Sequence, residues 1–159
     1  MKTETERKYL VEPALFDLKG IPHRLIEAGY YHESKAACPV AIRVTMNSRG
    51  VARICFKVGS GLSRTEVERD IEIPEATELL RWAPGRILKV RYSWDGWDVD
   101  QFLNQHDGLW LAEYEDEKAP TELPGWIDRE VTGNPQYENS YLAFNPTPNP
   151  HLFDDEIPF

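Results

Sequence analysis

The sequence predicts a mainly β, α+β fold: an eight-stranded antiparallel closed barrel with a few short helices. Three observations support this prediction. Charged residues recur at every second position in most apolar segments, as expected for strands, whose successive side chains point to opposite faces. Turn-forming residues join several of these segments into hairpins. Helix signals are few and short.

Each segment with this alternation is expected to form one strand. Clusters of Asn, Asp and Gly at 47–50, 95–96 and 105–108 predict hairpin turns. Antiparallel strands with one charged and one apolar face can close around a common interior, so we expect a barrel. The expected strands are residues 2–11, 24–33, 40–47, 51–58, 65–73, 87–94, 97–103 and 108–116.

Three short helices are expected between or after these strands. Proline at the first helical position, with acids in the first turn, predicts a helix over 74–80. Asn134 is the expected N-cap of a second helix over 134–143. A third helix is expected over 13–16, where proline again begins the segment.

Length, charge and composition exclude several classes of function. The 159 residues suit one domain, expected over 1–143, and the proline- and acid-rich segment 144–159 is expected to be a flexible tail. A net charge of −9 argues against nucleic-acid and anionic-membrane partners. With neither a membrane-spanning apolar stretch nor a secretory signal, a cytoplasmic protein is expected. Cys38 and Cys55 are too few for a disulfide scaffold or a zinc knuckle.

The charged residues of the expected strands are segregated by sign. Two carboxylates at positions i and i+2 lie ~7 Å apart. At an effective dielectric constant of about 20, such a pair repels by roughly 2.4 kcal/mol. A divalent cation is the simplest group that offsets this repulsion inside a barrel. The acids are Glu4, Glu6, Glu66, Glu68, Asp98, Asp100, Glu113 and Glu115, and the bases are Lys8, Arg43, Arg53, Lys57, Arg64, Lys89 and Arg91.

An interior lined in this way suits a complex of a divalent metal with a chain of phosphates. Carboxylates bind Mg²⁺ or Mn²⁺, and arginine and lysine bind phosphate. Phosphoryl transfer is the reaction that such a site supports. A single charged pair is more often a solvated strand face, but its recurrence on successive strands favours a functional interior.

Several segments resemble the motifs of the CYTH superfamily, the triphosphate tunnel metalloenzymes, and they follow one another in that family's order. The resemblance covers residues 1 to about 143. Arg43 and Lys57 match the starting arginine of the RxR strand and the lysine of FxxxK. The other matching segments are ETERK at 4–8, SRTEVE at 63–68, KVRY at 89–92, WDVDQF at 97–102, LAEYE at 111–115 and EVTGNPQY at 130–137.

The resemblance implies a Mg²⁺- or Mn²⁺-dependent hydrolase that removes the terminal phosphate of a linear triphosphate, most simply inorganic tripolyphosphate. It implies that Lys8 lies near the terminal phosphorus. The implied metal ligands are Glu4, Glu6, Glu113 and Glu115. The implied triphosphate-binding residues are Arg43, Lys57, Arg64, Lys89 and Arg91. Glu66, Glu68 and Asp100 would order the attacking water or hold a second metal.

The sequence departs from the family pattern at two positions. Thr45 stands where the RxR strand has its second arginine, and Leu88 stands where an acid precedes the lysine of KxR. If the two strands around 48–50 pair across a three-residue loop, Thr45 lies opposite Arg53. We therefore expect Arg53 to bind substrate in place of the missing arginine.

Other functions remain open from the sequence. A class IV-type adenylyl cyclase is disfavoured, because the histidine motif that precedes KxR in those enzymes is absent. A thiamine or nucleoside triphosphatase would differ only in the organic group held at the tunnel mouth. A non-catalytic polyphosphate-binding module is the alternative from another class. Whether the chain forms a homodimer is also left open.

Overall fold

The computed structural model describes residues 1–33, 39–59, 63–116 and 118–145, apart from the side chain of Glu4. Residues 146–159 of the expected tail and Cys38 lie outside these ranges. The strands are β1 (Lys2–Thr5), β2 (Arg7–Val11), β3 (His23–Tyr30), β4 (Val40–Asn47), β5 (Ala52–Val58), β6 (Ser63–Asp70), β7 (Gly85–Trp94), β8 (Trp97–Phe102), β9 (Trp110–Tyr114) and β10 (Ile127–Glu130). The helices are α1 (Ile73–Trp82), α2 (Asn139–Leu142) and the 3-10 turns η1 (Pro13–Leu15), η2 (Asn104–His106) and η3 (Pro135–Tyr137).

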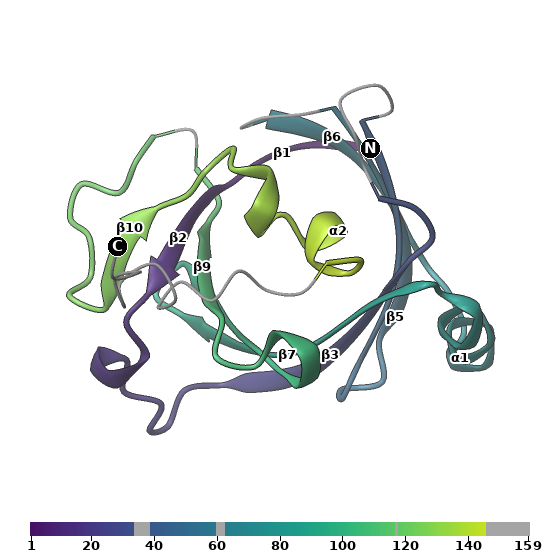
Figure 1. The fold of residues 1–159 in the computed structure, drawn as a ribbon, viewed down its shortest axis with the longest axis horizontal. Helices are drawn as coiled ribbons and strands as arrows, with labels where there is room; N and C mark the ends of the chain where they lie inside the picture. Colours follow the sequence, from purple (N-terminus) through teal and green to yellow (C-terminus); the bar gives the residue numbers. More distant parts are fainter. Residues whose placement is uncertain (34–38, 60–62, 117, 146–159) are drawn as a thin grey trace, which may run out of the picture.

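The strands form one antiparallel sheet in the order β1-β6-β5-β4-β3-β7-β8-β9-β2-β10, which curves around an interior (Figure 1). The mainly β, antiparallel fold is confirmed, but a closed eight-stranded barrel is not. The expected strand 2–11 is interrupted at Glu6, where the chain changes neighbours: β1 pairs with β6, and β2 pairs with β9 and β10. The hydrogen-bonded ladder therefore stays open, and Glu6 connects its first strand to its last but one.

Two further elements differ from the sequence expectation. β10 is not among the expected strands, because its four residues are too few to show an alternation, and its pairing with β2 contains a register shift. The helix expected over 134–143 is divided into η3 and α2 by Glu138, whose backbone is extended. The expected N-cap is confirmed: Asn134 accepts a 3.1 Å hydrogen bond from the backbone N–H of Gln136.

Two of the expected hairpin turns set the register of the strands that they join. The side-chain oxygen of Asn47 accepts hydrogen bonds from the backbone N–H groups of Arg49 (2.9 Å) and Val51 (3.2 Å). Asp95 and Gly96 have φ angles of 47° and 80°, which are left-handed values typical of a two-residue hairpin turn. Register decides which side chains face the interior, because a slip of one residue would reverse every strand face.

Helix α1 packs on the outer face of β3, β4 and β5 (Figure 1). Pro74 lies in its first turn, and the buried residues Ala76 and Leu80 face the sheet. The approach to β3 is close, because a Cβ atom at Gly29 would lie 2.7 Å from Cβ of Ala83. Among the described residues, no helix has both the length and the apolar character needed to cross a membrane.

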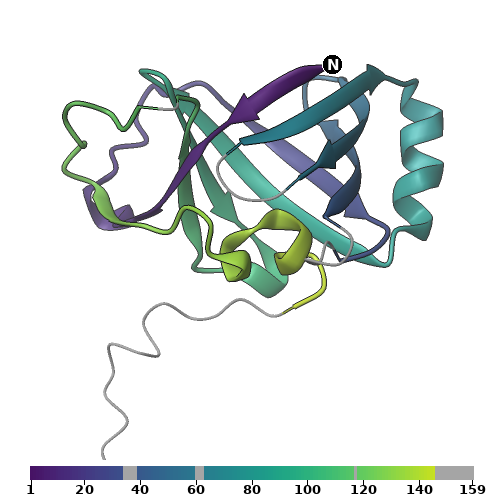
Figure 2. The same ribbon diagram turned by 90° about the horizontal axis from the view of Figure 1, so that it is seen from above.

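The apolar clusters of the described residues leave part of the interior polar. One cluster lies beneath α1, and a second, aromatic cluster around Trp97 and Trp126 packs on the outside of β2, β8 and β9. A third joins inward residues such as Leu10 and Phe102 to Leu142 of α2, so it fills the end of the interior where α2 lies (Figure 2). Charged side chains line the remaining space.

Candidate functional site

A polar cavity of about 210 Å³ lies in the part of the interior that the apolar clusters do not fill. The lining side chains of β3, β4, β6 and β7 stand at alternate positions, as expected for one face of a strand. Segments that are far apart in the sequence therefore meet at one place. The charged lining residues are Lys2, Glu6, Arg24, Arg43, Arg53, Lys57, Glu66, Glu68, Lys89, Arg91, Glu113 and Glu115.

Asp100 organises the bases of β7. Its fully buried carboxylate accepts hydrogen bonds from Nζ of Lys89 (2.6 Å) and from Nε and Nη2 of Arg91 (both 2.7 Å). Arg91 also donates to Asp98 (3.1 Å) and to Glu113 (2.9 Å). Burial by itself raises the pKa of Asp100, but Arg91 and Lys89 outweigh burial and hold that pKa below its usual value. Asp100 is therefore ionised and holds both bases in place.

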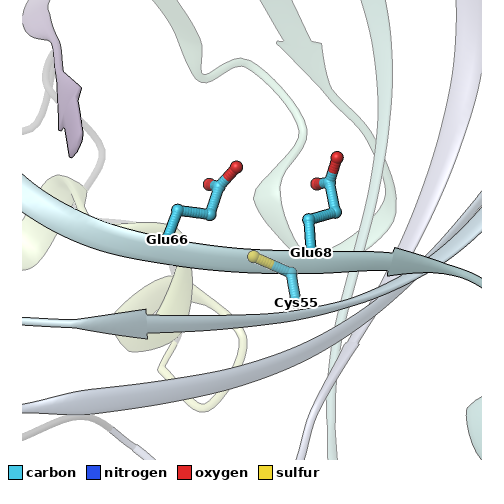
Figure 3. A group of neighbouring side chains, drawn as sticks. All are labelled: Cys55, Glu66 and Glu68. Atoms are coloured by element: carbon cyan, nitrogen blue, oxygen red, sulfur yellow. The ribbon is translucent and has the colours of Figure 1, made fainter. Parts of the chain in front are cut away.

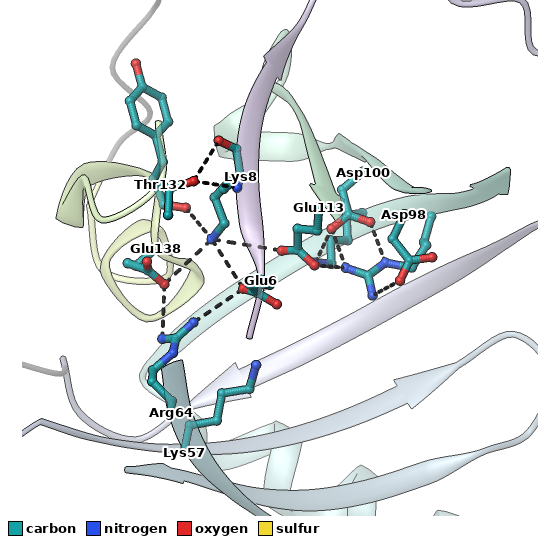
Figure 4. Close-up of polar contacts among 12 residues, drawn as sticks. Glu6, Lys8, Lys57, Arg64, Asp98, Asp100, Glu113, Thr132 and Glu138 are labelled. Atoms are coloured by element: carbon teal, nitrogen blue, oxygen red, sulfur yellow. Dashed lines mark hydrogen bonds and ion pairs between the residues drawn. The ribbon is translucent and has the colours of Figure 1, made fainter. Parts of the chain in front are cut away.

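Lys8 lies on β2 next to the apolar cluster that contains α2, and it is only 3% exposed. Its Nζ donates to the backbone oxygen of Tyr137 (3.1 Å) and lies 3.6, 3.9 and 4.0 Å from the carboxylates of Glu138, Glu113 and Glu6 (Figure 4). Burial by itself lowers the pKa of Lys8, but the three carboxylates outweigh burial and raise that pKa above its usual value. A buried ammonium group thus lies among converging acids.

Arg64 extends this network to β6. It donates to Glu138 (3.2 Å) and to Glu6 (3.3 Å), so Glu138 contacts both Arg64 and Lys8 (Figure 4). Burial raises the pKa of Glu138, but Lys8 and Arg64 outweigh burial and lower that pKa below its usual value. The segment between η3 and α2 therefore contributes an ionised carboxylate to a smaller pocket that adjoins the cavity on the side of α2, which we call the inner end.

A second wall of the cavity, formed by β4, β5 and β6, pairs acids of β6 with bases of β4 and β5. Glu66 lies 3.5 Å from Nζ of Lys57. Glu68 lies 3.8 Å from Arg43 and 3.2 Å from Arg53. Both walls of the cavity therefore carry alternating charges, with bases positioned by neighbouring carboxylates.

Cys55 lies on this wall between the bases of β5. Its sulfur and one carboxylate oxygen from each of Glu66 and Glu68 lie within 4.8 Å of one another (Figure 3). Burial raises the pKa of Cys55 to about 11, so the thiol is protonated at neutral pH. Because a cysteine binds metal as the thiolate, we assign Cys55 to packing within this wall and not to metal binding.

The structure brings most of the predicted site residues together, but three acids differ in position from the rest. Asp98 and Glu115 lie at the rim, where Asp98 binds Arg91 and Glu115 is exposed. Glu4 lies in β1, and its side chain is outside what the structure describes. The remaining predicted acids and bases line the cavity or contact a residue that does.

Thr45 lies directly opposite Arg53 in the β4–β5 register, as expected from the loop length. The guanidinium of Arg53 is, however, bound by acids of β6: Nε lies 2.9 Å from Asp70, and Nη1 lies 3.2 Å from Glu68. The side chain is 45% exposed. Arg53 therefore lies at the rim of the cavity rather than deep within it.

Sequence reasoning missed three charged residues of this site: Lys2 and Arg24, which line the cavity, and Glu138, which lies beside it. Lys2 stands two residues before Glu4 and continues the alternation of that strand to its first residue. Arg24 lies at the start of an expected strand whose other inward residues are apolar or aromatic, so no charged pair marked it. Extending the alternation of that strand to its first residue would have included Arg24. Nothing in the sequence signals Glu138, because its place depends on how the segment containing α2 packs into the interior.

Comparisons with known proteins agree with this architecture. No family model matches the sequence. The chain is 37% identical over 159 residues to an inorganic triphosphatase of Acetivibrio thermocellus, and the match covers 94% of this chain and 98% of that protein. A crystal structure described as the inorganic triphosphatase NE1496 has a TM-score of 0.66 at 24% identity, covering 89% of this chain and 98% of that one. A second structure, described as the hypothetical protein NE1496, has a TM-score of 0.65 at the same identity and coverage.

Proposed function

Since the chain belongs to the CYTH family of triphosphate tunnel metalloenzymes, we propose that it hydrolyses the terminal phosphoanhydride bond of inorganic tripolyphosphate with the help of a divalent metal ion. In this reaction water attacks the terminal phosphorus, the bond from that phosphorus to its bridging oxygen breaks, and pyrophosphate leaves. The relative that is 37% identical is itself described as an inorganic triphosphatase.

The observation that carries the proposal is the convergence of bases from both walls on one cavity. A linear triphosphate carries several negative charges, and arginine and lysine side chains bind phosphate oxygens through charge-assisted hydrogen bonds. The bases that we assign to triphosphate binding are Lys8, Arg43, Arg53, Lys57, Arg64, Lys89 and Arg91.

Lys8 is the base best placed to stabilise charge at the reacting phosphate. It is 3% exposed, its ammonium nitrogen lies within 4.0 Å of Glu6 and Glu113, which line the cavity, and three carboxylates keep it protonated. A fixed ammonium group in a site with little water stabilises charge on phosphate oxygens more strongly than one in solvent. We assign the terminal phosphorus to the space beside Lys8.

The acids around Lys8 suit a divalent cation. Oε1 of Glu6 and Oε1 of Glu113 both lie within 4.0 Å of its ammonium nitrogen, so these two carboxylates already converge on a cation. Glu115 follows Glu113 on the same strand face, and Glu4 completes the set in the sequence. This set contains only carboxylate oxygens, which suit Mg²⁺ or Mn²⁺. The ion, when bound, would neutralise phosphate charge and polarise the phosphorus–oxygen bonds.

The remaining acids have different surroundings, and we assign them different roles. Both oxygens of Asp100 are already bonded to Lys89 and Arg91, which supports a role in positioning these two bases. Glu66 and Glu68 face the cavity from β6 and are the acids that we assign to ordering the attacking water or to a second metal ion.

The test is an assay of phosphate release from tripolyphosphate, ATP and thiamine triphosphate with Mg²⁺ or Mn²⁺, with and without EDTA. We expect release from tripolyphosphate that EDTA abolishes. Glu6→Gln should reduce turnover at least about a hundredfold, since it removes a carboxylate from the proposed metal site. Glu12→Gln is the matched control, because Glu12 is an exposed acid just after β2 and should leave the rate unchanged.

Other outcomes would overturn the proposal. Formation of cyclic AMP from ATP would identify a cyclase, and faster turnover of thiamine triphosphate would identify a different hydrolase. Binding of tripolyphosphate without release of phosphate would indicate a non-catalytic module. Release that persists in EDTA would argue against the metal. As an independent readout of metal binding, Mn²⁺ should raise the melting temperature of the wild type more than that of Glu6→Gln.

A further inference from the structure

Arg24 is a cavity base that neither the sequence motifs nor the proposed reaction uses. It lies near the start of β3, is half-buried and lines the cavity. Its Cα partner on β7 is Arg91, so two guanidinium side chains lie opposite each other on the same face of an antiparallel pair. Like charges in that arrangement destabilise a sheet, so two adjacent guanidinium groups call for an anionic partner.

The charge environment of Arg24 differs from that of other cavity bases. Lys57, Lys89 and Arg91 each form an ion pair with a carboxylate. Among the side chains that the structure describes, no ion pair joins Arg24 to an acid. Burial and the charge of Arg91 both lower the pKa of Arg24 from its usual value, but a guanidinium stays protonated in proteins. Asp98 and Asp100 act on this charge in the opposite direction, but both are bound to Arg91, so among the described side chains no carboxylate forms an ion pair with Arg24.

Arg24 lies at the opposite end of the cavity from Lys8. Ala28 and Tyr30, further along β3, belong to the apolar cluster that fills the inner end, and Arg24 precedes Tyr30 by six residues, about 20 Å along a strand. A row of contacts leads from the inner end toward it: Glu113 lies 3.9 Å from Lys8 and 2.9 Å from Arg91, which faces Arg24.

We infer that Arg24, together with Arg91, binds the phosphate at the far end of the substrate from the bond that is cleaved, and that it favours an unsubstituted terminal phosphate over one that carries an organic group. The inference rests on the proposed function, since that function places the reacting phosphate beside Lys8. The far phosphate of tripolyphosphate offers three non-bridging oxygens to a guanidinium fork. The corresponding phosphate of ATP carries the nucleoside and offers one oxygen fewer and less charge.

This assignment gives Arg24 the part that the sequence suggested for Arg53. Thr45 leaves the RxR strand one arginine short, and Arg53, which faces Thr45, is bound by Asp70 and Glu68 instead. Arg24 faces the same cavity from the strand next to Thr45. The register pairs Thr45 with Ala28, four residues after Arg24 on β3, so Arg24 adds a guanidinium near the start of β3 and not at the position of the missing one.

The test compares the kinetics of Arg24→Gln and Arg24→Lys with those of the wild type, using tripolyphosphate and ATP as substrates. Because Arg24 would contact a part of the substrate that does not react, its loss should raise KM and leave kcat within about twofold. We expect KM for tripolyphosphate to rise about tenfold to a hundredfold in Arg24→Gln, the loss of a hydrogen bond to a charged group. In the same variant KM for ATP should rise by about threefold or less. The KM of Arg24→Lys for tripolyphosphate should lie between those of the wild type and Arg24→Gln.

Arg49→Gln is the matched control, because it removes the same charge from the exposed β4–β5 turn, close enough to influence Arg24. Equal losses in Arg49→Gln and Arg24→Gln would indicate long-range steering and overturn the inference. An unchanged KM in Arg24→Gln, with normal wild-type activity, would overturn it while leaving the proposed function intact.

Two further measurements separate the inference from the proposed function and from misfolding. If the wild type releases no phosphate, the proposed function fails, and calorimetric titration with tripolyphosphate in EDTA still tests Arg24: weaker binding by Arg24→Gln supports its role, and equal binding contradicts it. Thermal unfolding checks the fold. Arg24→Gln should melt no lower than the wild type, because it removes a charge that faces Arg91.

Discussion

Replacing Asp100 with alanine tests the charge network most directly. Asp100 is fully buried and accepts three short hydrogen bonds, one from Lys89 and two from Arg91. Arg91 would keep Asp98 and Glu113, but Lys89, only 6% exposed, would lose its carboxylate. Removing one partner of a buried ion pair costs about 3–5 kcal/mol, because the other charge stays buried without compensation. We expect Asp100→Ala to lower the free energy of unfolding by that amount.

Urea unfolding followed by tryptophan fluorescence would measure the loss, because Trp97 and Trp126 are buried in the aromatic cluster. The matched control is the double variant Lys89→Met/Asp100→Asn, which leaves no buried ammonium group without a carboxylate and keeps an acceptor for Arg91. This variant should be more stable than Asp100→Ala. A loss below about 1 kcal/mol in Asp100→Ala, or equal losses in both variants, would refute the reasoning, since 3–5 kcal/mol is expected for an uncompensated buried charge.

Three further predictions follow from burial and close packing. Neighbouring bases outweigh burial and lower the folded-state pKa values of Asp100, Glu113 and Glu138. Below about pH 4.3 the unfolded chain therefore takes up more protons than the folded protein, and the free energy of unfolding should fall. Urea unfolding midpoints at about pH 7 and about pH 3.5 measure this effect, and equal midpoints would contradict it. In a Cys38→Ser background, native Cys55, with its pKa of about 11, should resist iodoacetamide at pH 8 and react readily in urea, whereas rapid alkylation of the folded protein would disprove its burial as a neutral thiol. Gly29→Ala should lower the free energy of unfolding by about 1–3 kcal/mol, because the new methyl group would overlap Ala83, the residue that follows α1. Gly125→Ala, with open space around it, should have little effect in the same unfolding experiment.

Much of the candidate site could be predicted because a strand links each residue's position to a face. Once Lys89 and Arg91 are placed on one strand, both must point to the same side, and the same holds for Glu66 and Glu68. The structure places all four in the cavity or within its charge network. The expected N-terminal strand is divided into β1 and β2. The alternation continues through Glu6, but the strand with which the chain pairs changes there.

The sequence by itself determined which residues share a face, the turns that join the strands and the mixed charge of the interior, since these depend on neighbours in the chain. Only the tertiary structure decided that the ladder stays open at Glu6, that Asp100 holds Lys89 and Arg91, that Arg24 lines the cavity, and that Glu138 contacts Lys8 and Arg64. These features depend on which strands become neighbours and on where α2 packs. Such contacts join residues far apart in the chain, and no local pattern records them.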